Sequence, residues 1–149
     1  MVAGRNGLIK VYVFTIDGKD AASFKCHHLQ DISLQPSDVR DAPVASISQL
    51  LYTPTLPSIT VTTSDFHILT YSLTTAAASP LQLSRRLIGC SDDILDLCLI
   101  PSNENDDGAY RLAVVSNSNV LQVVNEKNEA SPVVGHADTV LAVDVSPDG

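Results

Sequence analysis

Residues 135–149 read GHADTVLAVDVSPDG, and residues 89–101 carry the same pattern as GCSDDILDLCLIP. The two stretches align without a gap, and Gly135 lies 46 residues after Gly89. In both, a glycine is followed by a polar turn with an aspartate, Asp92 or Asp138, and then by a nearly continuous apolar run. Such a run predicts a strand that is buried on both faces. A period of this length is typical of folds built from repeated supersecondary units.

The strand signals recur in one order within each copy. First strands are predicted from Ile94 and from Val140, and a weaker third copy begins at residues 43–47, with Val44 in the place of Ile94. After each first strand come a β-branched second strand, a tight polar turn, a third strand and a fourth strand. The second, third and fourth strands are predicted at residues 59–63, 68–73 and 82–87 in one copy and at 111–115, 120–124 and 131–134 in the next. Four strands in each repeat and no helical period predict an all-β fold.

The N-terminal residues fit the same scheme if they begin within a unit. Residues 2–4 are predicted to end a second strand, residues 5–7 to form a turn and residues 8–14 to form a third strand, with a fourth strand near residues 22–26. Asn-Gly at positions 6 and 7 is a strong hairpin signal, because both residues tolerate a positive φ.

Residues 135–149 resemble the opening of a WD repeat, because few families pair Gly-His with a Ser-Pro-Asp-Gly turn at this spacing. Residues 5–12 resemble the turn and third strand of another repeat, with Tyr12 where the family usually carries tryptophan. The resemblance implies a β-propeller, in which each repeat contributes four strands. Residues 86–97 and 113–118, followed by the Gly-His segment, are similar to the transducin-beta-like WD family of the small-subunit processome.

On this interpretation the chain is a propeller fragment, cut within a blade at both ends. Residues 1–42 are expected to hold the trailing part of a blade and a linker loop, residues 43–88 and 89–134 one blade each, and residues 135–149 the first strand of a further blade. Because a propeller protects its strand edges by closing into a ring, the isolated chain is expected to be marginally stable or to aggregate.

The resemblance also implies a function. It implies a nucleolar protein-binding scaffold in pre-ribosomal RNA processing, with other WD-repeat and processome proteins as partners. Small nucleolar RNA and pre-ribosomal RNA are expected to be contacted mostly through the complex. No catalysis, cofactor, metal, membrane or small-molecule substrate is expected. A generic WD-repeat adaptor of another complex is the alternative, and a propeller hydrolase or lectin-like binder has no recognisable constellation in the sequence.

Family members often carry a buried hydrogen-bond network in each blade, made by histidine, aspartate, serine or threonine, and tryptophan. At those positions the first full blade offers Arg40 near the histidine, with Thr62 or Thr63, Asp65 and Tyr71. The second offers Cys90 for histidine, Asn117 or Asn119 for aspartate and Val124 for tryptophan, and only His136 is a well-placed histidine. We therefore expect neither full blade to complete the network and no imidazole to contact Asp65, because a half-satisfied buried network is costly.

Composition excludes several other functions. The formal net charge of −8 opposes the phosphate attraction on which nucleic-acid binding depends. Three cysteines without a CxxC pair are expected to be free thiols, with Cys98 in the core. No apolar stretch has the length of a membrane span.

Four polar motifs favour ordinary structural roles over chemical ones. Cys26-His27-His28 alternates between strand faces, which argues against a zinc site. Residues 103–108 mimic half of a calcium loop, but a hairpin loop is favoured. Asp92, Asp93 and Asp96 could be paired carboxylates, but Asp92 recurs as Asp138 and is assigned to turn geometry. The basic residues at 84–86 are assigned to an exposed strand end.

Two long loops are candidate partner contacts, because a sheet fixes the position of a loop while the loop sequence is free to vary. They are predicted at residues 29–42 and 74–80.

Overall fold

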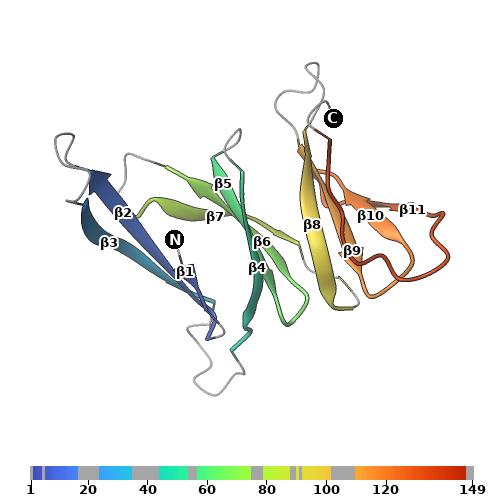
Figure 1. Cartoon of the computed structure of the whole chain (residues 1–149), viewed down its shortest axis with the longest axis horizontal. Helices are drawn as coiled ribbons and strands as arrows, with labels where there is room; N and C mark the ends of the chain where they lie inside the picture. The colour runs from blue at the N-terminus through green and yellow to red at the C-terminus, as the bar shows by residue number, and fades with distance from the viewer. Residues whose placement is uncertain are drawn as a thin grey trace. The chain divides into compact units, whose positions relative to one another are not determined.

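The computed structural model confirms the all-β prediction. It describes residues 2–4, 6–16, 24–34, 44–53, 57–74, 79–87, 90, 92–101 and 110–146, and these residues form eleven strands in three antiparallel sheets, with no helix among them (Figure 1). The sheets are consistent with partial blades of a WD-repeat propeller. The chain divides into two compact units, Met1–Arg86 and Leu87–Gly149.

The first unit holds two sheets. The smaller has the order β1 (Val2–Ala3), β2 (Leu8–Ile16) and β3 (Phe24–Ser33). The larger follows chain order, with β4 (Ile47–Thr53), β5 (Ser58–Thr63), β6 (Ile68–Leu73) and β7 (Leu81–Leu87). Strands that neighbour one another in sequence also pair in space, which is the meander expected of a propeller blade.

The core of the first unit lies between these two sheets. Ile9 and Val11 of β2 pack against the buried face of β4–β7, which contributes Ile59, Val61, Leu69, Tyr71 and Leu81. All six residues of β5 are buried, as its β-branched sequence predicts for a strand covered on both faces.

The second unit holds one sheet with the order β8 (Ile94–Pro101), β9 (Tyr110–Ser116), β10 (Leu121–Val124) and β11 (Ala130–Val133). Its buried apolar residues come mainly from β8 and β9, namely Leu97, Cys98, Leu112, Ala113, Val114 and Val115, together with Val124. The predicted second, third and fourth strands of both repeats are present, and their ends shift by one residue or none.

Matching bulges show how the two four-stranded sheets correspond. Ile47 pairs with Thr63 and Ile94 with Ser116, and in both sheets the register shifts immediately afterwards. The equivalent of Ile94 is therefore Ile47, and the prediction that placed Val44 there was wrong by three residues. Val44 is apolar but precedes β4, and an apolar pattern does not mark where pairing with the next strand begins, so the alignment of apolar runs placed the repeat three residues early.

Two further predictions differ from the structure. Residues 140–146 were expected to begin a strand, but they are in no strand, because no described strand lies beside them to complete a ladder. The fourth strand expected near residues 22–26 continues to Ser33, so residues 29–33 belong to β3 and not to a loop. The remainder of that loop from residue 35 to residue 42 lies outside the described residues, as do 75–78 of the second loop.

Candidate interaction surfaces

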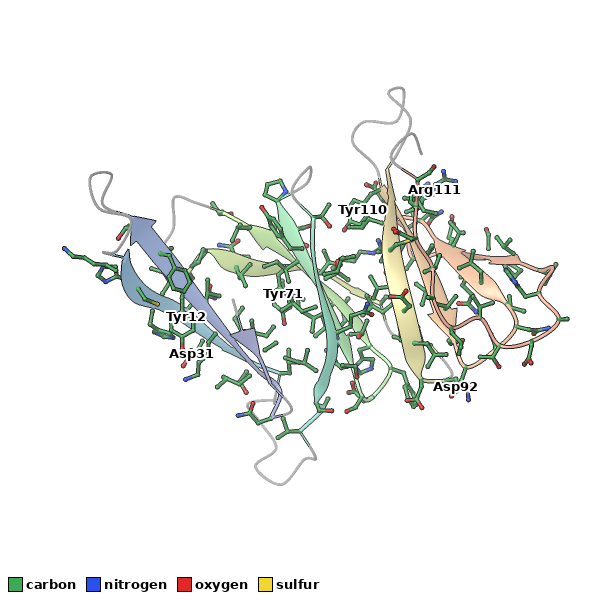
Figure 2. All side chains as sticks on the ribbon, in the orientation of Figure 1. Tyr12, Asp31, Tyr71, Asp92, Tyr110 and Arg111 are labelled. Atoms are coloured by element: carbon green, nitrogen blue, oxygen red, sulfur yellow. The ribbon has the colours of Figure 1, made fainter. Side chains whose placement is uncertain are left out.

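The predicted repeat positions do not all meet at one place. Asp65 lies in the turn between β5 and β6. The corresponding end of the β8–β11 sheet holds Asp92, Gly135, His136 and Asp138. Figure 2 shows Asp92 at one end of β8 and Tyr110 at the other. Tyr12 and Tyr71 lie within strands. Gly89 lies outside the described residues.

Asp65 organises the β5–β6 turn. Its Oδ1 accepts a short hydrogen bond from Thr63 Oγ1, and its Oδ2 lies 3.1 Å from His67 Nδ1. Thr63 Oγ1 also accepts from the backbone N–H of His67 at 3.1 Å. The expectation that no imidazole contacts Asp65 was wrong. The imidazole comes from two residues along the same turn, and not from the segment before the first strand.

The geometry of this turn explains the contact. Thr63 and His67 are joined by a backbone hydrogen bond of 3.0 Å, and Phe66 has a φ of 63°. A residue in the left-handed region closes a short hairpin loop and brings the flanking side chains to one side. Sequence spacing could have indicated this, because Thr-x-Asp-x-His places three polar side chains on alternate residues.

The equivalent turn between β9 and β10 uses two serines. Ser116 and Ser118 stand where Thr63 and Asp65 stand, with their hydroxyls 3.4 Å apart, and Ser118 Oγ accepts from the Val120 N–H at 3.2 Å. The assignment of Asn117 or Asn119 to the aspartate position was therefore wrong. In the β5–β6 turn the Thr63 hydroxyl accepts from the His67 N–H, whereas here the Ser118 hydroxyl accepts from the Val120 N–H. This turn therefore keeps a hydroxyl–backbone hydrogen bond but has no carboxylate.

The two asparagines instead bind neighbouring segments. The backbone N–H of Asn117 donates to Asp93 O at 3.1 Å, as Ser64 N–H donates to Ser46 O in the first unit. Asn119 Nδ2 donates to the carbonyl oxygen of His136 at 3.3 Å. These contacts join the turn to the segment that precedes β8 and to the segment that follows β11.

Asp92 and Asp138 make the same local contact. Asp92 Oδ1 accepts from the Asp93 N–H at 2.8 Å, and Asp138 Oδ1 accepts from the Thr139 N–H at 2.7 Å. Both contacts are typical of aspartate in a turn. His136 and Gly135 are exposed near Asp138, and space around the Gly135 α-carbon is open.

Asp96 differs from these turn residues because it also binds a segment distant in sequence. Its carboxylate accepts from the N–H of Leu97 at 2.9 Å and from the N–H of Val143 at 3.0 Å. Together with the Val140 N–H bond to Ser118 O, this anchors residues 140–146 to the β8–β11 sheet. The half-buried carboxylate thus accepts hydrogen bonds from the backbone of two segments.

The two tyrosines differ in environment. Tyr71 is buried in the core of the first unit; burial raises the pKa of its hydroxyl, and the nearby Arg86 opposes this shift. Tyr12 packs edge-on against His28, with ring centroids 5.4 Å apart. Val124, at the position that corresponds to Tyr71, is also buried.

The Cys26-His27-His28 motif lies on β3. Cys26 is opposite Phe14 and His28 is opposite Tyr12 on one face, while His27 is opposite Val13 on the other. His28 Nε2 lies 2.6 Å from Asp31 Oδ1. Within the described ranges no group of three or more metal-ligating side chains is found.

The three cysteines are free thiols in different surroundings. Cys26 is exposed, whereas Cys98 is buried as predicted. Burial raises the pKa of Cys90, and burial followed by the charges of Asp144 and Asp96 raises the pKa of Cys98.

Two motifs remain, the predicted hairpin loop and the basic stretch. Residues 103–108 lie outside the described residues. In the basic stretch, Ser84 Oγ donates to Thr70 O at 2.9 Å, which places it inside the sheet and not in a loop. No helix of the described chain is long and apolar enough to cross a membrane.

Comparison with known proteins adds to the fold assignment. The chain is 29% identical over 147 residues to Transducin beta-like protein 3 of Rattus norvegicus, a match that covers 97% of this chain and 15% of that protein. No family model matches. The similarity suggests a WD-repeat protein, in agreement with the three propeller-like sheets, and together they suggest a non-enzymatic scaffold.

Proposed function

We propose that this chain is part of a protein-interaction scaffold of the small-subunit processome, which acts in ribosome biogenesis and pre-ribosomal RNA processing. The observation that carries the proposal is the similarity to Transducin beta-like protein 3, which extends over 97% of the chain. The resemblance of residues 86–97, 113–118 and 135–149 to the transducin-beta-like WD family supports the same assignment.

The contacts of the polar residues agree with a binding role. Asp65, Asp92, Asp96 and Asp138 each hold backbone or a neighbouring side chain within their own turn or sheet. Carboxylates used in this way stabilise turns, and propeller turns of fixed shape are suitable platforms for partner proteins.

The proposed partners are other WD-repeat and processome proteins in the nucleolus. The net charge of −8 opposes tight direct binding of RNA, so small nucleolar RNA and pre-ribosomal RNA are proposed to be held mainly through the complex.

Affinity purification from cells tests the proposal. The full-length protein is tagged and purified, and its bound RNAs and proteins are identified. Recovery of box C/D small nucleolar RNA together with other processome subunits is the expected result. A different stable complex without these components would favour a generic WD-repeat adaptor instead.

A further inference from the structure

The β2–β3 pair is longer than the equivalent pairs of the other two sheets. β2 and β3 contain 9 and 10 residues, against 6 and 7 in β6 and β7 and 4 each in β10 and β11 (Figure 1). The additional length is not needed for the core, because the core contacts of β2 come from Ile9 and Val11.

Beyond Val11 the pair leaves the core and carries exposed apolar side chains. Val13 lies on the same face as Ile9 and Val11 by strand alternation, yet 41% of it is exposed. Leu29, the extra residue at the β-bulge of β3, is also 41% exposed. Phe14 is 60% exposed, but it lies on the opposite face of β2 from Val13. Neighbouring exposed apolar side chains of this kind mark an interaction surface more often than a single one does.

The outer edge of β3 presents backbone groups that point away from β2. Leu34 N–H donates to Gly7 O, so by antiparallel alternation the backbone N–H and C=O of Asp31 point away from β2. No strand follows β3 in the order of its sheet among the described residues. A strand with such an edge can accept an added strand from a partner.

The outer edges of the other two sheets are each blocked at one outward-facing residue. At β7, the side-chain amide of Gln30 binds both backbone groups of Leu81, donating to its O at 3.0 Å and accepting from its N–H at 2.9 Å. At β11, Asn125 N–H donates to Glu129 O, and the backbone groups of successive residues then point alternately toward and away from β10. The nitrogen of Pro132 therefore faces the open side, where it has no hydrogen to donate.

Charge indicates the chemistry of the partner. The β2–β3 pair carries Lys10, Lys25 and two histidines against one carboxylate, Asp31, which already contacts His28. Residues 1–86 hold 7 basic and 6 acidic residues, a formal charge of +1, so the acidity of the chain belongs to residues 87–149. An acidic segment would therefore meet no repulsion at this strand pair.

From these observations we infer that the outer edge of β3, with Val13 and Leu29 beside it, binds an extended acidic segment of a partner protein that contains apolar residues. The partner segment adds as a strand to β3. This inference rests on the proposed scaffold function, for which it names a docking surface. An RNA ligand is disfavoured, because two lysines supply too little charge for phosphate binding and the surface is partly apolar.

Defined probes test the inference on the full-length protein by fluorescence anisotropy. The first probe is a labelled peptide of about ten alternating glutamate and valine residues. The second replaces glutamate by lysine, the third carries N-methyl groups on all backbone nitrogens so that neither edge can donate, and the fourth is a uridine oligonucleotide. We expect the first to bind at least about tenfold more tightly than the other three, because only it has both the charge and the backbone donors. Equal binding of the methylated peptide, or tighter binding of the RNA, would overturn the inference.

Variants locate the site. Val13→Asp combined with Leu29→Asp is expected to weaken the first peptide at least about tenfold, because it removes apolar contact and adds like charge. The matched control is Leu83→Asp on β7, where Leu83 is 54% exposed, and it is expected to leave binding unchanged. Equal weakening by both variants would place the site elsewhere.

A separate readout distinguishes failure of this inference from failure of the scaffold proposal. Processome subunits are quantified after purification of the tagged wild-type protein. If they are absent, the scaffold proposal fails whatever the peptides do. If they are present and the peptides do not bind, only the β3 inference fails.

Discussion

The side-chain amide of Gln30 joins the two sheets of the first unit, and replacing it with alanine removes two hydrogen bonds at once. Both bonds go to the backbone of Leu81, a residue that is 3% exposed, at distances of 3.0 and 2.9 Å. Each hydrogen bond contributes about 0.5–1.5 kcal/mol net, so Gln30→Ala is expected to destabilise the contact by about 1–3 kcal/mol. Gln30→Glu keeps the acceptor for the N–H but places an oxygen against Leu81 O, and should be at least as harmful.

Hydrogen exchange of the full-length protein, followed by mass spectrometry, measures this effect locally. Opening near the start of β7 becomes faster by about 5-fold to 150-fold if the stabilisation falls by about 1–3 kcal/mol. The control is Gln82→Ala, which changes the same residue type at an exposed position of β7. Exchange in Gln30→Ala that matches the control would refute the assignment of the amide as a link between the sheets.

Three further outcomes are expected. Asp65→Ala should lower the stability of the β5–β6 turn by about 1 kcal/mol, because Thr63 and His67 lose a shared acceptor, and a melting temperature equal to that of the wild-type protein would contradict this. Asn128→Ala should cost about 1 kcal/mol and Asn128→Gly much less, because Asn128 has a φ of 64°; urea titration showing equal losses would exclude backbone conformation as the cause. Maleimide should label the exposed Cys26 before the other two cysteines. The raised pKa values of Cys90 and Cys98 favour their neutral thiols, so the stability that these thiols contribute is present below the pKa of an unfolded thiol, about 8.5, and is lost as the pH rises through their folded pKa values. Denaturation midpoints that do not fall at alkaline pH would disagree.

The order of the strands could be predicted because the signals that set it are local. The β-branched runs of β5 and β9 and the polar turns after them identify a meander without knowledge of tertiary contacts. The start of β4 could not be placed, because the apolar residues begin at Val44 while pairing with β5 begins only at Ile47, and sequence pattern does not report where pairing begins.

The length of β3 was missed for a different reason. Its residues 29–33 alternate between exposed and half-buried positions, but the half-buried Gln30 is polar and the exposed Leu29 is apolar, so the sequence lacks the apolar alternation that predicts a strand. Its pairing with β2 depends on backbone hydrogen bonds, which sequence pattern does not report.

The contacts of the candidate residues were only partly predictable. The role of Asp92 and Asp138 in turns followed from their recurrence at the same place in the repeat. The contact of His67 with Asp65 has a signal in the Thr-x-Asp-x-His spacing, but it also depends on the left-handed φ of Phe66, which is uncommon for a large side chain.

Depletion of the full-length protein from cells tests the central claim most directly. Levels of small-subunit ribosomal RNA and of its precursors are measured before and after depletion, with re-expressed wild-type protein as the control. A scaffold of the small-subunit processome predicts that precursors accumulate, that mature small-subunit RNA falls while large-subunit RNA persists, and that wild-type protein restores processing. Unchanged small-subunit RNA after complete depletion would contradict the assignment.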